Sequence, residues 1–151
     1  MLMGNDVYLL DTDTVSNYLD KRRGNKQLRR RIEQATPETI WISIITFEEI
    51  MRGILSLLNQ ARKHPRNAAK IVEYYLLLRS LAQDLYSFQI LPYDIAAETK
   101  YQTIPPSVRQ QHPQDSHIAA IALANNFTLV TLNIRHFSKI SDLCTEDWSI
   151  E

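Results

Sequence analysis

Val7-Tyr8-Leu9-Leu10-Asp11-Thr12-Asp13 sets the architecture of this chain, because four apolar residues run directly into two carboxylates separated by one threonine. A short apolar run at the head of alternating strand and helix signals is typical of a buried parallel strand. Open α/β sheets bind their ligands in the crevice at the C-terminal ends of such strands. Two acids crowded at that edge repel each other unless a cation lies between them. The stretch therefore predicts a metal site at the edge of a sheet.

The rest of the chain alternates between helix and strand patterns. β-Branched and aromatic residues predict further strands over 39–44, 87–91 and 127–131, with a last short strand in the tail. Apolar residues at helical spacing predict helices over 14–21, 28–33, 46–58, 71–85, 95–103 and 116–124. Such alternation implies one α/β domain, residues 1–151, with a parallel sheet and right-handed crossovers.

The composition narrows the class of protein. Lys plus Arg equals Asp plus Glu at 17 each, so the chain as a whole does not steer polyanions. The single cysteine, Cys144, excludes an intramolecular disulfide and fits a reducing compartment. No apolar run approaches the roughly 18 residues of a membrane span, and the N-terminus lacks the pattern of a signal peptide. We predict a cytoplasmic protein without membrane contact.

Three acids share one context, because each lies where a strand ends or a helix begins: Asp11, Glu49 and Asp115. Together they favour a divalent cation with oxygen ligands, Mg²⁺ or Mn²⁺. Each also has a purely structural alternative. Thr46-x-x-Glu49 matches a capping box, and Asp115 could simply cap its helix. Asp11 follows a buried run directly and has the weakest alternative of this kind.

Four segments resemble, in order and spacing, the motifs of PIN-domain nucleases, and most of all the VapC ribonuclease toxins of toxin–antitoxin pairs. They are Leu10-Asp11-Thr12-Asp13, Ser43-Ile44-Ile45-Thr46-Phe47-Glu48-Glu49-Ile50, Asp115-Ser116-His117-Ile118-Ala119-Ala120 and Leu129-Val130-Thr131-Leu132-Asn133-Ile134-Arg135-His136-Phe137. The resemblance implies a three-layer α/β fold with a central, mostly parallel sheet of four or five strands, flanking helices and a long antiparallel helix pair.

The resemblance also implies a Mg²⁺- or Mn²⁺-dependent endoribonuclease. Asp11, Glu49 and Asp115 match the family's three metal-site acids. Thr12, Asp13, Ser43, Thr46 and Asn133 match the polar positions around them. Asp13 departs from the asparagine often found there, and Asn133 stands where many relatives carry a fourth acid, so a second metal is in doubt. His136 also stands where several relatives carry an acid, and we expect no replacement from it.

Further implied partners are an RNA substrate, a cognate antitoxin that enters the groove beside the acids, and a second copy in a homodimer. A basic cluster between positions 21 and 31 could hold RNA phosphates, or could be an ordinary solvated helix face. We assign RNA contacts to Arg22, Arg23, Lys26 and Arg52. Arg52 could also pair with Glu49, three residues earlier on the same helix.

Other functions remain open. The neutral Asn133 keeps alive a noncatalytic PIN-like scaffold that binds RNA or a protein. A receiver-type phosphoacceptor at Asp11 lacks a lysine at a later strand end. The histidines around Asp115, namely His112, His117 and His136, suggest zinc, but their spacing favours unconnected surface side chains. Cys144 lacks the partners that thiol catalysis needs.

Overall fold

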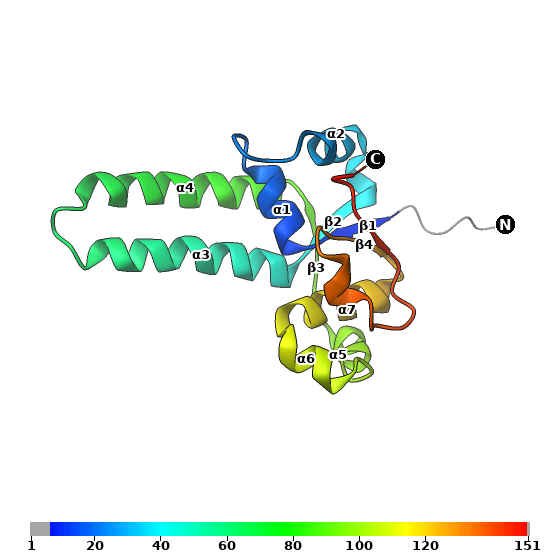
Figure 1. Cartoon of the computed structure of the whole chain (residues 1–151). Coiled ribbons are helices and arrows are strands. Elements are labelled where there is room, and N and C mark those ends of the chain that lie inside the picture. Colours follow the sequence, from blue (N-terminus) through cyan, green and yellow to red (C-terminus); the bar gives the residue numbers. More distant parts are fainter. Residues whose placement is uncertain (1–6, 151) are drawn as a thin grey trace.

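The computed structural model describes residues 7–150, so residues 1–6 and 151 of the predicted domain lie outside the described residues. The opening apolar run forms β1 (Tyr8–Leu10), the middle strand of a five-stranded sheet with the order β3-β2-β1-β4-β5 (Figure 1). The other strands are β2 (Ile40–Ser43), β3 (Gln89–Leu91), β4 (Thr128–Val130) and β5 (Thr145–Glu146). All four strand pairs are parallel, which confirms the predicted α/β class.

The register of the sheet aligns the ends of its central strands. Leu10 is paired with Ile42 of β2 and with Val130 of β4. The next residues, Asp11 and Thr131, therefore leave the sheet at one level, and the amide of Asp11 donates to the carbonyl oxygen of Val130 at 3.0 Å. Polar groups that lie far apart in the sequence meet at this edge.

Successive residues of β1 point to opposite faces of the sheet, and each face carries its own core. Leu9 lies in a core with residues of α5 (Ile95–Tyr101), α6 (Pro106–Gln111) and α7 (Pro113–Asn125). Leu10 lies in the other core, with residues of α1 (Thr12–Leu19) and α2 (Lys26–Gln34). These two cores make the predicted three layers.

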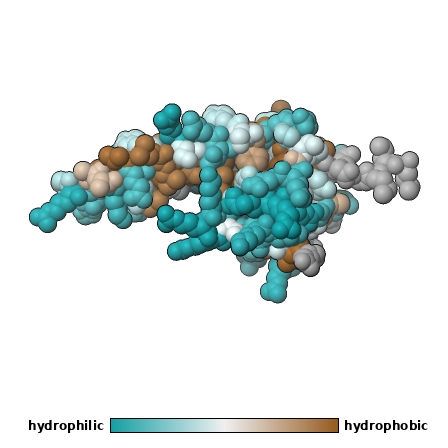
Figure 2. Space-filling view, turned by 90° about the horizontal axis from the view of Figure 1, so that it is seen from above, coloured by the Kyte–Doolittle hydropathy of each residue, from teal (hydrophilic) through white to brown (hydrophobic). Residues whose placement is uncertain are grey.

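The long helix pair consists of α3 (Ile44–Arg62) and α4 (Ala68–Tyr86), which project together from the body as an arm (Figure 1). Apolar side chains remain exposed along this arm and gather there in Figure 2. They include Leu55, Leu57, Val72, Leu76 and Leu77. Within residues 7–150, the search for a helix with the length and hydropathy of a membrane span found none.

Helix α6 (Pro106–Gln111) is missing from the sequence-based prediction. In the sequence, Pro105 and Pro106 read as the stop of the preceding predicted helix, residues 95–103. Proline is nevertheless favourable in the first turn of a helix, where its missing N–H would have no intrahelical partner. Pro106 therefore begins α6, whereas the preceding helix α5 already ends at Tyr101. Two short 3-10 helices, Pro37–Thr39 and η2 (Ile134–Phe137), complete the fold.

Candidate metal and catalytic site

Asp11 joins the sheet to the first helix. Its side chain is the N-cap of α1 and accepts from the amide of Thr14 at 2.9 Å, so neither Thr12 nor Asp13 caps this helix. The Thr14 hydroxyl donates in turn to the carbonyl of Val130 at 3.1 Å. Only 2% of Asp11 is exposed. The position of this carboxylate is therefore set by backbone groups on two elements.

Burial makes the charge of Asp11 unfavourable. Desolvation is the largest effect and raises the pKa of Asp11 from 3.8 to about 6, against hydrogen bonds from Thr131 and Thr14 that lower it. The negative charge of Asp13 adds to the rise. An acid of this kind gains from a nearby cation, which is the electrostatic signature of a functional carboxylate.

Glu49 is held by a side chain from another helix. The Thr12 hydroxyl donates to Oε1 of Glu49 at 2.6 Å and lies 3.0 Å from the Thr46 hydroxyl. The cap of α3 is instead Ser43, whose Oγ accepts from the amide of Thr46 at 3.0 Å. The capping-box alternative for Glu49 is therefore wrong, because α3 begins at Ile44, two residues before Thr46.

The pKa of Glu49 is raised chiefly by desolvation and further by the negative charges of Asp115 and Asp13, while the hydrogen bond from Thr12 lowers it. The influence of Asp115 across 66 positions of sequence shows that both acids face one region of the molecule. Carboxylates from β1, α3 and α7 thus load this edge of the sheet with negative charge.

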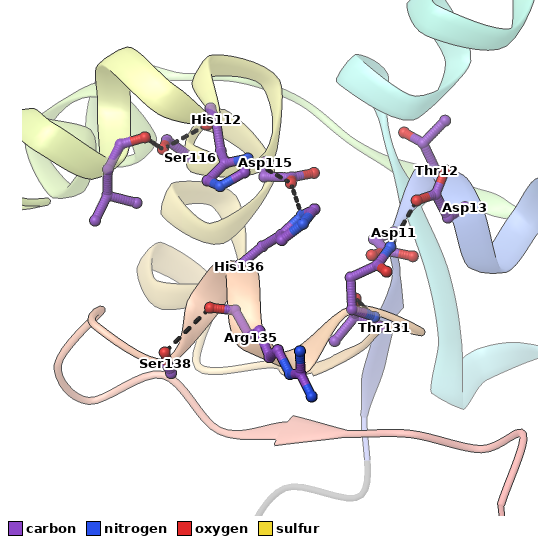
Figure 3. Close-up of polar contacts among 12 residues, drawn as sticks. Asp11, Thr12, Asp13, His112, Asp115, Ser116, Thr131, Arg135, His136 and Ser138 are labelled. Carbon is purple, nitrogen blue, oxygen red and sulfur yellow. Dashed lines mark hydrogen bonds and ion pairs between the residues drawn. The ribbon is translucent and has the colours of Figure 1, made fainter.

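Asp115 lies in the first turn of α7 but is not its N-cap, since the cap is His112 without a side-chain bond. The Asp115 Oδ2 lies 2.9 Å from Nδ1 of His136 and 3.9 Å from Nδ1 of His112. The two imidazole rings stack at 4.1 Å (Figure 3). The expectation that the histidines around Asp115 lie apart is therefore wrong for His112 and His136.

His117 behaves as expected and turns away from this group. Its Nδ1 lies 2.7 Å from the carbonyl oxygen of Pro113, and its ring stacks on Tyr101. Within residues 7–150, the one group of at least three side chains placed to hold a metal ion is His112, Asp115 and His136. The charge of Asp115 acts on Glu49, but neither Glu49 nor Asp11 belongs to a group of that closeness.

Asp13 and Asn133, two of the three positions expected to depart from the family pattern, contact each other. The side-chain amide of Asn133 donates to Oδ2 of Asp13 at 2.7 Å, across 120 positions of sequence. The backbone amide of Asn133 also donates to the hydroxyl of Thr131 at 2.9 Å. The charge missing at Asn133 is therefore present one hydrogen bond away, on Asp13.

The basic residues divide into two sets. Arg29 bonds the carbonyl of Tyr18 at 2.7 Å, and Arg31 stacks over Trp148, so both stabilise the fold. Exposed cations remain available for anions, namely Lys21, Arg22, Arg23, Lys26 and Arg30. Arg52 pairs with Glu48, not with Glu49 as the sequence suggested.

Comparison with known proteins identifies the family of this chain. The family model described as PIN domain matches residues 8–143. The chain belongs to the PIN-domain family. Its relatives include a ribonuclease VapC1 from Haemophilus influenzae strain R2866, 30% identical over 95% of this chain and 98% of the relative. A ribonuclease VapC2 from Rickettsia felis is 26% identical over 94% and 98%.

Solved structures agree with this PIN-domain assignment. VapBC-1 from nontypeable Haemophilus influenzae matches with a TM-score of 0.71 and 25% identity, over 95% of this chain and 99% of that one. FitAcB from Neisseria gonorrhoeae matches with a TM-score of 0.72 at 24% identity, over 93% and 97%, and supports the fold alone.

Asp11 should make the metal-free protein less stable as the pH rises. Its pKa is about 6 when folded and 3.8 when unfolded, so the folded chain holds the proton more tightly. The free energy of unfolding then falls between about pH 4 and pH 6. Asp11→Asn keeps a capping side chain without this titration, and from pH 4 to 7.5 it should gain about 2 kcal/mol on the parent.

Urea unfolding in EDTA at several pH values measures this difference. Asp94→Asn is the matched control, because Asp94 is an exposed N-cap that accepts from the amide of Ala97. It separates the effect of burial from that of capping. A gap between parent and Asp11→Asn that stays constant with pH would contradict the assigned cause.

Proposed function

We propose that this PIN-domain chain is a metal-dependent endoribonuclease that hydrolyses RNA phosphodiester bonds, acting as the toxin of a type II toxin–antitoxin pair. The observation that carries the proposal is the buried carboxylate of Asp11, whose pKa is raised to about 6 at an edge shared with Glu49 and Asp115. Relatives named ribonuclease VapC, and structural neighbours that are toxin–antitoxin complexes, support it.

The acids suit Mg²⁺ or Mn²⁺. Carboxylate oxygens are the donors these ions prefer, and Mg²⁺ usually keeps several waters while it binds one or two carboxylates directly. Such an ion does not require its carboxylate ligands to touch each other. The raised pKa values of Asp11 and Glu49 independently support a bound cation. A cation would offset the desolvation and the repulsion between carboxylates that raise these pKa values.

Asp11 and Asp115 are assigned as the principal metal ligands, with Glu49 as a third ligand or as the acceptor of a metal-bound water. A bound Mg²⁺ or Mn²⁺ supplies charge to the phosphoryl oxygens and lowers the pKa of its water. Thr12 holds the Glu49 carboxylate through its 2.6 Å hydrogen bond. Ser43 and Thr46 fix the start of α3, and with it the height of Glu49 above the sheet.

A second candidate is a PIN-like scaffold that binds RNA or protein without cutting. Asn133 favours it, because this side chain offers an amide where many relatives offer an acid. The contact between Asn133 and Asp13 weakens this candidate, since a carboxylate is still present at that corner of the site. A cleavage assay separates the two functions, because a scaffold would bind RNA and leave it intact.

Cleavage of a structured RNA by the purified chain should require Mg²⁺ or Mn²⁺ and stop in EDTA. Asp115→Asn should lower the rate by roughly 100-fold or more, as expected when one stabilising group of an active site is removed. Glu73→Gln, which changes an exposed acid on α4, is the control and should cut normally. Undiminished cutting by a folded Asp115→Asn variant would reject the assignment.

The contact between Asp13 and Asn133 can be tested by exchanging the two side chains. Asp13→Asn alone should remove the charge and slow cleavage, and Asn133→Asp alone should place two carboxylates within hydrogen-bond distance and lower stability. The double variant restores one acid and one amide, and should recover most of the activity. Rates and urea unfolding of the four proteins form a double-mutant cycle. Independent, additive effects would show that the pair does not act as a unit.

The antitoxin is assigned to a groove beside the acids. A depression of about 460 Å³ is bordered by α1, α3 and α4, and its lining includes Thr12, Glu49, Gly53, Leu77 and Leu81. Its walls are largely apolar, and two residues of the proposed site lie at its rim. An apolar helix could bury its face there while a basic side chain reached the acids, as the resemblance implies.

Gly53 provides the test, because a Cβ at this position would meet nothing within 4 Å and would point into free space. Gly53→Phe should fill the groove and abolish copurification with the product of a short reading frame adjoining the gene. Gly53→Ala adds only a methyl group and should retain it. Equal copurification of both variants would place the partner elsewhere.

The exposed cations at positions 21–23, with Lys26, are assigned to the RNA backbone, since they are free of the structural contacts that hold Arg29 and Arg31. Arg52 is also exposed, but its ion pair with Glu48 competes with any phosphate.

The homodimer and the cytoplasmic location stay predictions from the sequence.

A further inference from the structure

Three side chains beside the proposed nuclease site have donor atoms that suit a different kind of metal. They are His112 before the first turn of α7, Asp115 within that turn and His136 in η2. Their ligand atoms all lie within 4.8 Å of one another, and Figure 3 shows the two imidazoles and the carboxylate turned toward one another. We call this group the His–Asp–His cluster.

The geometry of the cluster is close to that of a coordinated ion. Zinc binds histidine nitrogen and carboxylate oxygen at about 2.0–2.2 Å, so two ligand atoms of a tetrahedral site are about 3.3 Å apart. The two distances to Asp115 Oδ2, 2.9 Å from His136 and 3.9 Å from His112, lie on either side of that value. All three ligand atoms lie within 4.8 Å of one another, so a bound ion would draw them closer together through side-chain rotation.

The backbone holds two of the three ligands in place. His112 donates its amide to Val108 at 2.8 Å, and its carbonyl accepts from the amide and the hydroxyl of buried Ser116 at 2.9 and 2.7 Å. The amide of His136 donates to the carbonyl of Asn133 at 3.0 Å. The cluster is therefore prepared by the junction of α6 with α7 and by η2, not by flexible loops.

The donor set selects the class of ion. Imidazole nitrogen suits Zn²⁺ and other transition metals, whereas Mg²⁺ prefers oxygen. The three side chains remain 29–39% exposed, which leaves room for water as further ligands. Three protein ligands with open positions describe an exchangeable or catalytic site better than a closed structural one.

We propose that His112, Asp115 and His136 bind one divalent transition-metal ion, for which Zn²⁺ is the probe. The binding itself does not depend on nuclease activity. Only its consequence rests on the proposed function, because Asp115 would be shared with the oxygen-ligated ion of Asp11 and Glu49. His112 and His136 would then form, with the shared Asp115, a second metal site beside the first. The neutral Asn133 lacks the charge to complete such a site.

Isothermal titration of the untagged, chelator-stripped chain with Zn²⁺ should show one ion bound per chain, with no comparable binding of Mg²⁺ at the same concentrations. His112→Gln and His136→Gln should each weaken Zn²⁺ binding by at least about 10-fold. His64→Gln, at the exposed turn between α3 and α4, is the matched control and should bind normally. Co²⁺ should report the same site through its visible absorption spectrum.

Unfolding of each variant in EDTA checks that loss of binding does not reflect loss of the fold. Zn²⁺ affinity unchanged in both histidine variants would overturn the proposal, as would absence of stoichiometric binding to the parent chain. Asp11→Asn should keep Zn²⁺ binding while it loses RNA cleavage. Zn²⁺ binding without any cleavage by the parent would reject the nuclease and leave the cluster standing, and Mg²⁺-dependent cleavage without Zn²⁺ binding would do the reverse.

Discussion

The carboxylate of Asp11 must be buried, because it ends the middle strand of a parallel sheet and begins the helix that covers one face. Asp11 is subject to three constraints: the register of β1 with β4, its role as the cap of α1, and its exclusion from solvent. Burial raises its pKa to about 6. A negative charge that the fold itself makes unfavourable is the physical basis of the proposed cation site at this edge.

The side chains of Glu49 and Asp115 do not cap their own helices, because other residues occupy the cap positions. Ser43 caps α3, so Glu49 is released to bond Thr12, and α7 begins at His112 without using the Asp115 side chain. A carboxylate bound to its own helix end would be both satisfied and turned away from solvent. Here Glu49 stays half-buried with a raised pKa, and Asp115 faces two histidines.

Three positions expected to depart from the family pattern, Asp13, Asn133 and His136, make contacts that only the structure reveals. Asp13 and Asn133 touch, so the acid and the amide have in effect exchanged places across one hydrogen bond. His136, expected to replace nothing, faces Asp115 together with His112. These side chains bear on the proposed choice of ion, because ion selectivity follows ligand type and charge.

The amino-acid sequence alone determined the order of strands and helices, the parallel sheet and Asp11 as a metal-site candidate, because these follow from local apolar patterns and from a carboxylate that ends a buried run. It did not reveal α6, whose first proline resembles a helix stop, nor the true cap of α3. Tertiary structure alone decided the contacts of Glu49 with Thr12, of Asp13 with Asn133 and of His136 with Asp115. Each joins segments 21 to 120 positions apart, and only the register of the sheet and the packing of its helices bring them together.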